Sequence, residues 1–277
     1  MADSSSSSGS ASDPEPTDPS ILNSRRGKPQ RGSPTDAIPE VVTDYLTQVG
    51  FIHVARMRHI QIDAPLISAM VEKWRPETHT FHMTQSEMTI TLQDVARILG
   101  LPTDGIVVTG STSEDWPAVC AAVFGAVPLA SEFHHSGDLR ISFLDRLYTR
   151  WISLGCWLLA DKSGGSNIGC RLVPLLGVGF DEIGCFCWGS AVLAHLFRNL
   201  CECTDAGRSD MGGCHILFQI WAWIRFPPIA PPLPLHQEPG THYGCRFNTV
   251  AKFKPHEVVH YRETLDTICR DEVVWQP

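Results

Sequence analysis

The chain has 277 residues, 43% hydrophobic and 19% charged, so it can bury the core of one large domain, and wholesale disorder is excluded. Its formal net charge of −8 disfavours nonspecific binding of nucleic-acid phosphates by the domain as a whole. The most apolar stretches, 154–160 and 216–224, are shorter than the ~20 apolar residues that span a bilayer, and no secretory signal opens the sequence. We therefore expect an intracellular protein without a membrane span.

Residues 1–39 are rich in Ser, Pro, Gly and Asp. Such a composition predicts a disordered tail, because few apolar side chains are present to offset the entropy lost on ordering. The tail holds a small basic cluster of Arg25, Arg26, Lys28 and Arg31. This cluster could serve as a nuclear address or as a weak phosphate contact, although short basic clusters are more often simply solvated. Residues 40–277 are expected to form the domain.

Two helices and a hairpin are predicted at the start of this domain. Residues 40–49 have the pattern of a short helix that ends at Gly50. Asp63 is a good N-cap for a second helix, whose apolar stripe extends to a stop at Pro76. Residues 78–83 and 87–92 alternate with the two-residue period of strands, which predicts one small β-hairpin.

The remainder of the domain has the pattern of further helices. Thr91 begins a capping box, completed by Asp94, for a helix that ends before Gly100. Helical periodicity, interrupted by Gly or Pro clusters, also covers residues 115–124, 139–160, 185–203 and 213–225. The proline-rich sequence after Phe226 predicts an extended polyproline segment, and residues 257–274 predict a final helical stretch. The expected fold is therefore mainly α, an irregular multi-helix globular domain with one small β-hairpin.

No catalytic, cofactor or metal site is predicted. Potential zinc ligands gather in one region, but their Cys-x-Cys spacing directs neighbouring thiols to opposite sides of a helix, so buried thiols are the better interpretation. These are Cys185, Cys187, Cys201, Cys203, Cys214 and His215. The glycine-rich stretch 161–165 lacks the order of a phosphate-binding loop, and Ser190 lacks the second glycine of a hydrolase nucleophile elbow. For His79, His82 and His195, a partly buried and hydrogen-bonded ring is the ordinary explanation.

Five stretches carry a family resemblance. They are GFIHVARMRHIQIDAPLISAMVEKWRPETHTFHM from Gly50, EMTITLQDVARILGLPTDG from Glu87, WGSAVLAHLFRNLC from Trp188, GGCHILFQIWAWIRFP from Gly212 and YRETLDTICRDEVVWQP from Tyr261. Together they closely resemble the plant mobile domain family, and the resemblance covers nearly everything after the tail. The family also has an aminotransferase-like label and includes MAINTENANCE OF MERISTEMS proteins and domains of plant transposable elements.

The resemblance implies a nuclear protein with a role in meristem maintenance, genome stability and silencing of transposable elements. It also implies that the protein acts together with a plant serine/threonine protein phosphatase. No catalytic residues are established for the family, so the resemblance assigns none here. The aminotransferase-like label does not fit as chemistry, because a pyridoxal-phosphate enzyme needs a Schiff-base lysine and a phosphate cup in a large α/β scaffold. None of the five lysines has such a context: Lys28, Lys73, Lys162, Lys252 and Lys254. We therefore do not expect this chain to be an enzyme.

Two departures from the family pattern are expected to matter. The connection between Ser142 and Leu154 is shorter than in typical relatives. The sequence also stops at residues 275–277, where the family pattern usually continues into another helical portion. Both features are typical of a truncated or transposon-related copy.

The leading hypothesis is a non-enzymatic nuclear interaction module that binds nuclear proteins. The candidate partner-binding residues are Trp74, Arg75, His79, His82, Trp188 and Arg225, because Trp and Arg dominate protein interfaces when exposed. For Trp74 and Trp188, burial in the core is the better interpretation. The alternative is a transposon-derived nucleic-acid-binding domain that uses the basic tail and local positive patches around Arg56, Arg58 and Arg97. A third possibility is an enzyme whose site leaves no sequence pattern.

Overall fold

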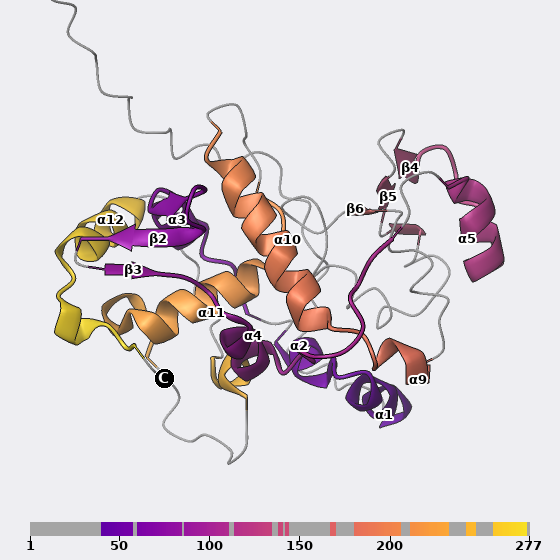
Figure 1. The fold of residues 1–277 in the computed structure, drawn as a ribbon, viewed down its shortest axis with the longest axis horizontal. Helices are drawn as coiled ribbons and strands as arrows, with labels where there is room; N and C mark the ends of the chain where they lie inside the picture. Colours follow the sequence, from indigo (N-terminus) through magenta and orange to yellow (C-terminus); the bar gives the residue numbers. More distant parts are fainter. Residues whose placement is uncertain are drawn as a thin grey trace, which may run out of the picture.

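The structure, a computed structural model, describes residues 40–57, 60–84, 86–110, 114–134, 138–140, 142–143, 167–169, 180–205, 211–232, 242–247 and 257–275. The predicted tail, 1–39, lies outside these residues, and so does Arg58. Where the chain is described, most of its regular structure is helical, which confirms the predicted fold class (Figure 1). None of the helices in this part of the chain is long and apolar enough to cross a membrane.

The helices include most of those predicted, in the same order, and two that were not predicted, over residues 52–56 and 180–183. The described helices are α1 (Glu40–Gln48), α2 (Ile52–Arg56), α3 (Ala64–Val71), α4 (Leu92–Leu99), α5 (Trp116–Phe124), α9 (Phe180–Ile183), α10 (Trp188–Cys203), α11 (His215–Arg225) and α12 (Glu257–Thr267). Single turns of 3₁₀ helix are η4 (Pro227–Ile229), η5 (Tyr243–Arg246) and η6 (Arg270–Glu272). The prediction of an extended polyproline segment is wrong at its start, where Pro227–Ile229 form the turn η4, closed by the Ile229 N–H donating to the Phe226 carbonyl (3.0 Å). Residues 233–240 of that segment lie outside the described part.

Local capping residues set the ends of several helices as the sequence predicts. The Asp63 side chain accepts a hydrogen bond from the Leu66 N–H (3.0 Å) at the start of α3. Thr91 and Asp94 form the reciprocal capping box of α4, and Gly100 ends that helix with φ 69°, a left-handed conformation that favours glycine.

The predicted hairpin is confirmed, with an additional strand. The first sheet has the antiparallel order β1 (Trp74–Arg75), β2 (Thr80–Met83), β3 (Ser86–Met88). Phe81 pairs with Trp74 on one side and with Met88 on the other. Residues 74–75 were predicted to lie at the end of a helix that stops at Pro76, but α3 ends at Val71. The apolar spacing that suggested a longer helix only requires Trp74 to face inward. A strand does this equally well, since Trp74 packs against Phe81.

A second small sheet was not predicted. It contains β4 (Phe133–His134), β5 (Asp138–Arg140) and β6 (Asn167–Gly169) in an antiparallel order. The prediction of a helix over 139–160 is wrong at its start, where β5 stands, and residues 144–160 lie outside the described part. Strands of two or three residues are too short to produce a recognisable alternation. Figure 1 shows this sheet with α5 to one side of the main helical body.

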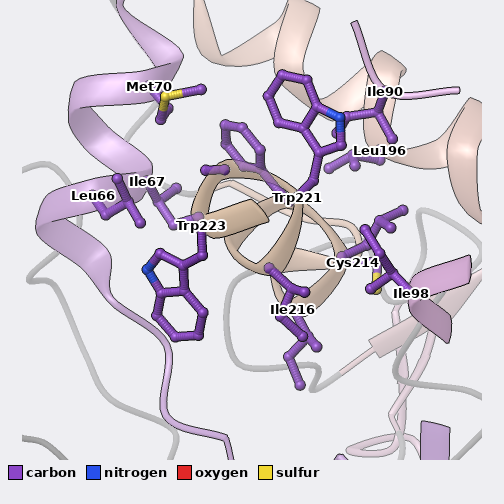
Figure 2. Close-up of a cluster of buried hydrophobic side chains, with 14 of the residues drawn as sticks. Leu66, Ile67, Met70, Ile90, Ile98, Leu196, Cys214, Ile216, Trp221 and Trp223 are labelled. Carbon is purple, nitrogen blue, oxygen red and sulfur yellow. The ribbon is translucent and has the colours of Figure 1, made fainter. Parts of the chain in front are cut away.

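Helix α11 forms the centre of the core. Its residues from Ile216 to Trp223 are all buried, as expected for a helix that is surrounded on every side. Figure 2 shows Trp221 on the side of Ile90 and Leu196, Trp223 on the side of α3, and Ile98 of α4 beside Cys214. The labelled neighbours are Leu66, Ile67 and Met70 of α3, Ile98 of α4, Leu196 of α10, and Ile90. The core thus joins segments from both halves of the chain.

Candidate functional site

The two candidate tryptophans lie in the core. Trp74 is 1% exposed, and its ring centroid lies 4.8 Å from that of Phe81. Trp188 is 7% exposed, lies 5.4 Å from Phe51 in an edge-on arrangement, and donates from Nε1 to the carbonyl of Ile183 (2.9 Å). Their interpretation as core residues is confirmed, so neither presents its ring to a partner in this fold.

Arg225 is also committed to contacts within the fold. Its side chain is 12% exposed, and Nη2 lies 2.6 Å from Asp94 Oδ1. Its Nη1 donates to the carbonyls of Val274 (3.1 Å) and Trp275. A guanidinium held by a buried carboxylate and two carbonyls ties α11 to α4 and to the C-terminal residues, rather than to a partner.

The other three candidates lie on one hairpin. Arg75 is in β1, His82 is in β2, and His79 is the last residue of the turn between them. The His79 N–H donates to the Arg75 carbonyl (2.9 Å) and closes the turn. Because side chains alternate along a strand, Phe81 and Met83 enter the core while His82 faces outward. The sequence predicted His79 and His82 in the hairpin but Arg75 at the end of a helix, and the structure brings Arg75 beside them because residues 74–75 form β1.

We define the hairpin face as Arg75, Thr78, Thr80, His82 and Glu87. The register places Arg75 beside Thr80 and His82 beside Glu87. The Thr78 and Thr80 hydroxyls are 2.7 Å apart, and His82 Nε2 lies 3.5 Å from Glu87 Oε1. Arg75 donates only to the carbonyls of Glu72 and Trp74, and no carboxylate of the described residues pairs with it. The face thus offers a cation, a carboxylate, hydroxyls and an imidazole to polar groups of a partner.

His79 has the only positive φ (54°) found among the non-glycine residues of the described chain. Left-handed backbone costs a side chain about 1 kcal/mol, so surrounding contacts must hold it. The His79 carbonyl accepts from the Thr89 hydroxyl (2.7 Å), and its ring lies parallel to that of Phe197, with centroids 6.0 Å apart. The turn is therefore fixed from both sides, and the exposed His79 is presented in one conformation.

A buried polar network lies behind the hairpin. Asp63, with no exposed surface, accepts from the Tyr261 hydroxyl (2.6 Å), and its N–H donates to Gln219 Oε1 (2.6 Å). Burial raises the pKa of Asp63 from 3.8 to about 6, although its hydrogen bonds from Tyr261 and Leu66 act in the opposite direction. Burial, with the hydrogen bond to Asp63 and its charge, also raises the pKa of Tyr261. The network joins α3, α11 and α12.

Helix α12 makes further polar contacts that the sequence did not predict. Arg262 Nε lies 2.9 Å from Glu72 Oε2, and this bond raises the pKa of Arg262. Lys73 forms an ion pair with Asp266. A tyrosine in the apolar stripe of α12 could have indicated a buried hydroxyl that needs a partner, but nothing in the sequence identifies Asp63 as that partner.

The described cysteines range from buried to exposed, with Cys201, Cys203 and Cys245 partly buried, and the interpretation as a buried thiol is wrong for Cys185. Cys120, Cys187 and Cys214 are buried, whereas Cys185 and Cys269 are exposed. Burial raises the pKa of Cys214 to about 12, which keeps its thiol protonated and makes it a poor metal ligand or nucleophile. Among the residues that the structure describes, no three His, Cys, Asp or Glu side chains are close enough to hold a metal ion.

Comparisons with known proteins identify the family. The chain is 35% identical to the serine/threonine-protein phosphatase 7 long form homolog of Arabidopsis thaliana, over 86% of its own length and 20% of that protein. It is 33% identical to Protein MAIN-LIKE 2 of the same plant, over 84% of its length and 38% of the relative. It is 31% identical to Protein MAINTENANCE OF MERISTEMS, also of that plant, over 83% of its length and 51% of the relative.

The chain thus spans between a fifth and about half of the length of these curated relatives. No solved structure matches it. The family profile described as "Plant mobile domain" matches residues 50–277, which include α2 to α12, the hairpin face and the buried network. The chain therefore belongs to the plant mobile domain family.

Proposed function

We propose that the chain is a non-enzymatic nuclear interaction module of the plant mobile domain type. It binds nuclear proteins and supports meristem maintenance, genome stability and the silencing of transposable elements. One observation carries the proposal. The region that matches this chain covers 20% of a relative named as a phosphatase homolog and 51% of Protein MAINTENANCE OF MERISTEMS, whose name describes no reaction. A domain that accompanies such different remainders acts as a module beside them.

The hairpin face is the proposed binding surface. Its side chains are polar and close together, and the strained turn at His79 fixes their spacing. A rigid surface loses little conformational entropy when a partner binds, so modest polar contacts suffice for affinity. Exposed Arg75, without a carboxylate partner in the described part of the chain, is the residue expected to contribute most.

A plant serine/threonine protein phosphatase is the proposed class of partner. A relative named as such a phosphatase contains this domain within the same polypeptide. Where the domain and the phosphatase are separate chains, binding would bring them as close together as a covalent link does within one chain. The purified chain alone is expected not to hydrolyse a phosphate monoester, and hydrolysis that copurifies with it would refute the non-enzymatic part of the proposal.

The alternative of nucleic-acid binding is less well supported by the charges. Four cations form ion pairs with carboxylates inside the fold: Lys73 with Asp266, Arg198 with Glu202, Arg225 with Asp94, and Arg262 with Glu72. Cations that neutralise internal carboxylates are not available to phosphates, and the formal net charge of the chain is −8. A protein partner is therefore the better proposal.

Affinity purification of the tagged chain from plant nuclei, with and without nuclease, tests the proposal. Mass spectrometry of the wild type should recover a phosphatase or silencing factors in both conditions. The double variant Arg75→Ala, His82→Ala should lose these partners at least about tenfold, because each exposed hot spot contributes on the order of 1 kcal/mol or more. The variant Glu263→Ala, at an exposed position of α12, is the matched control and should retain them.

One result would contradict the proposed function, and another would contradict only the proposed surface. Partners that disappear after nuclease treatment would favour the nucleic-acid alternative. Equal recovery by the wild type and the double variant would show that the binding surface lies elsewhere, while the module itself would stand. Thermal unfolding of each variant verifies that the fold is retained, since surface substitutions usually change stability by less than about 0.5 kcal/mol.

A further inference from the structure

The segment after α4 is fixed along one edge by the start of α10. The Ile106 N–H donates to the Cys185 carbonyl, and the Ile106 carbonyl accepts from the Cys187 N–H, both at 2.8 Å. This is the pattern of a parallel bridge. The Gly189 N–H also donates to the Pro102 carbonyl (2.7 Å). In Figure 1 the segment is the extended magenta stretch that leaves α4 and passes the lower end of α10.

Close packing excludes sliding along this edge. A Cβ at Gly105 would overlap the Cys185 carbonyl, and one at Gly189 would lie 2.9 Å from the Pro102 carbonyl oxygen. Two glycines therefore allow the backbones to approach, and the register between the two segments is set on both sides of Ile106.

The opposite edge of the same segment is open. Val107 is 69% exposed, the highest value for a large apolar side chain in the described part of the chain, and Ile106 is 58% exposed. In an extended chain, neighbouring residues direct their backbone groups to opposite edges, so Val107 directs its N–H and C=O away from Cys185 and Cys187. No hydrogen bond of the described residues involves the Val107 backbone. We call residues 104–108 the open edge.

Charge determines which partner this edge fits. Asp104, within the open edge, and Glu182, three residues before Cys185, are both exposed. Neither forms an ion pair with a cation of the described chain. Two copies of the chain that paired edge to edge would bring these carboxylates together, and like charges disfavour such pairing. A segment with basic residues on either side would instead be attracted.

We infer that the open edge binds an extended segment of a partner protein by strand addition, and that this segment has β-branched apolar residues flanked by Lys or Arg. The Val107 N–H and C=O can exchange water for the backbone of an added extended segment, and exposed Ile106 and Val107 provide apolar contacts for its alternate side chains. The inference rests on the proposed interaction function and supplies it with a second surface, separate from the hairpin face.

Hydrogen exchange of the full chain with a synthetic peptide tests the inference. The peptide alternates Val and Thr between lysine pairs, and a matched peptide has glutamate in place of lysine. Without peptide the Val107 amide should exchange freely, because it donates to no acceptor among the described residues. The lysine peptide should slow exchange over residues 104–108 at least about tenfold, and the glutamate peptide should not.

Three variants distinguish strand addition from other binding. Val107→Pro removes the outward N–H but leaves the Ile106 bonds to 185–187, and it should weaken peptide binding at least about tenfold. Val107→Thr keeps the N–H and the β-branch, and it should bind as the wild type does. Asp104→Lys, an exposed substitution, should weaken the lysine peptide severalfold and admit the glutamate peptide.

Equal binding of both peptides, or unchanged binding by Val107→Pro, would overturn the inference. Self-association of the wild type that Val107→Pro abolishes in sedimentation would overturn it in favour of a second copy at this edge. The proposed function is tested separately. Nuclease-resistant partners recovered equally with wild type and Val107→Pro would retain the interaction module and reject only the open edge.

Discussion

The substitution Asp63→Asn tests the electrostatics of the buried network. Asp63 has no exposed surface, and burial raises its pKa from 3.8 to about 6. Between these two pH values the folded chain holds a proton that the unfolded chain releases. The contribution of this carboxyl to stability is therefore fully present below pH 3.8 and is lost as pH rises through about 6. Each pH unit of pKa difference is worth about 1.4 kcal/mol, so the loss amounts to about 3 kcal/mol.

Asparagine removes the ionisation and preserves the geometry. Its oxygen can accept from the Leu66 N–H as an N-cap, and its amide can donate to the Tyr261 oxygen. The free energy of unfolding of the variant, relative to the wild type, should therefore rise by about 3 kcal/mol between pH 3 and pH 8. Urea unfolding at several pH values, followed by the fluorescence of the buried tryptophans, measures this difference.

Tyr261→Phe provides the second arm of the test. The Tyr261 hydroxyl lowers the pKa of Asp63, so its removal should raise that pKa further and move the loss of stability to higher pH. A difference between wild type and Asp63→Asn that stays constant with pH would refute the reasoning. A difference that changes in the opposite direction would mean that the cap and the tyrosine outweigh burial.

Three further predictions concern contacts at other positions. Arg225→Met should cost about 3 kcal/mol, measured by urea unfolding, because it leaves the buried Asp94 carboxylate without its cation, and Asp94→Asn combined with it should cost less than the sum of the single changes. His79→Ala should be less stable than His79→Gly by about 1 kcal/mol, since only glycine accepts a φ of 54° without strain, and equal stabilities would remove the argument for a strained turn. Gly244→Ala should lower the melting temperature by several degrees, because its Cβ would lie 2.5 Å from the Ile98 carbonyl oxygen, and an unchanged melting temperature would mean that η5 shifts freely.

Local contacts made much of the fold predictable. The capping box of α4 needs only Thr91 and Asp94, three residues apart, and Gly100 ends the helix from within the same short stretch. The end of α3 could not be predicted in this way. Residues 74–75 are strand because Trp74 pairs with Phe81, and their helical period gave no indication of that contact. The sheet of β4 to β6 requires β6, which pairs with β5 although the two strands are far apart in the sequence. No local sequence pattern could therefore predict this sheet.

The candidate site was predictable where exposure follows from strand alternation. His82 and Phe81 are neighbours with opposite orientations, and the period of two assigns one to solvent and the other to the core. Arg225 was not predictable, because its partner Asp94 lies 131 residues earlier and nothing in α11 indicates it. The function proposed for the hairpin face stays a prediction until a partner is identified.

The hairpin face is positioned by a helix that lies far away in the sequence. Lys73, just before β1, forms its ion pair with Asp266, and the Thr84 hydroxyl, just after β2, donates to the carbonyl of the same residue (2.8 Å). The two ends of the β1–β2 hairpin are thus held by one residue of α12, which is itself fixed on α3 through Tyr261 and Arg262. A change in α12 can therefore alter partner binding at the hairpin without touching any residue of the face.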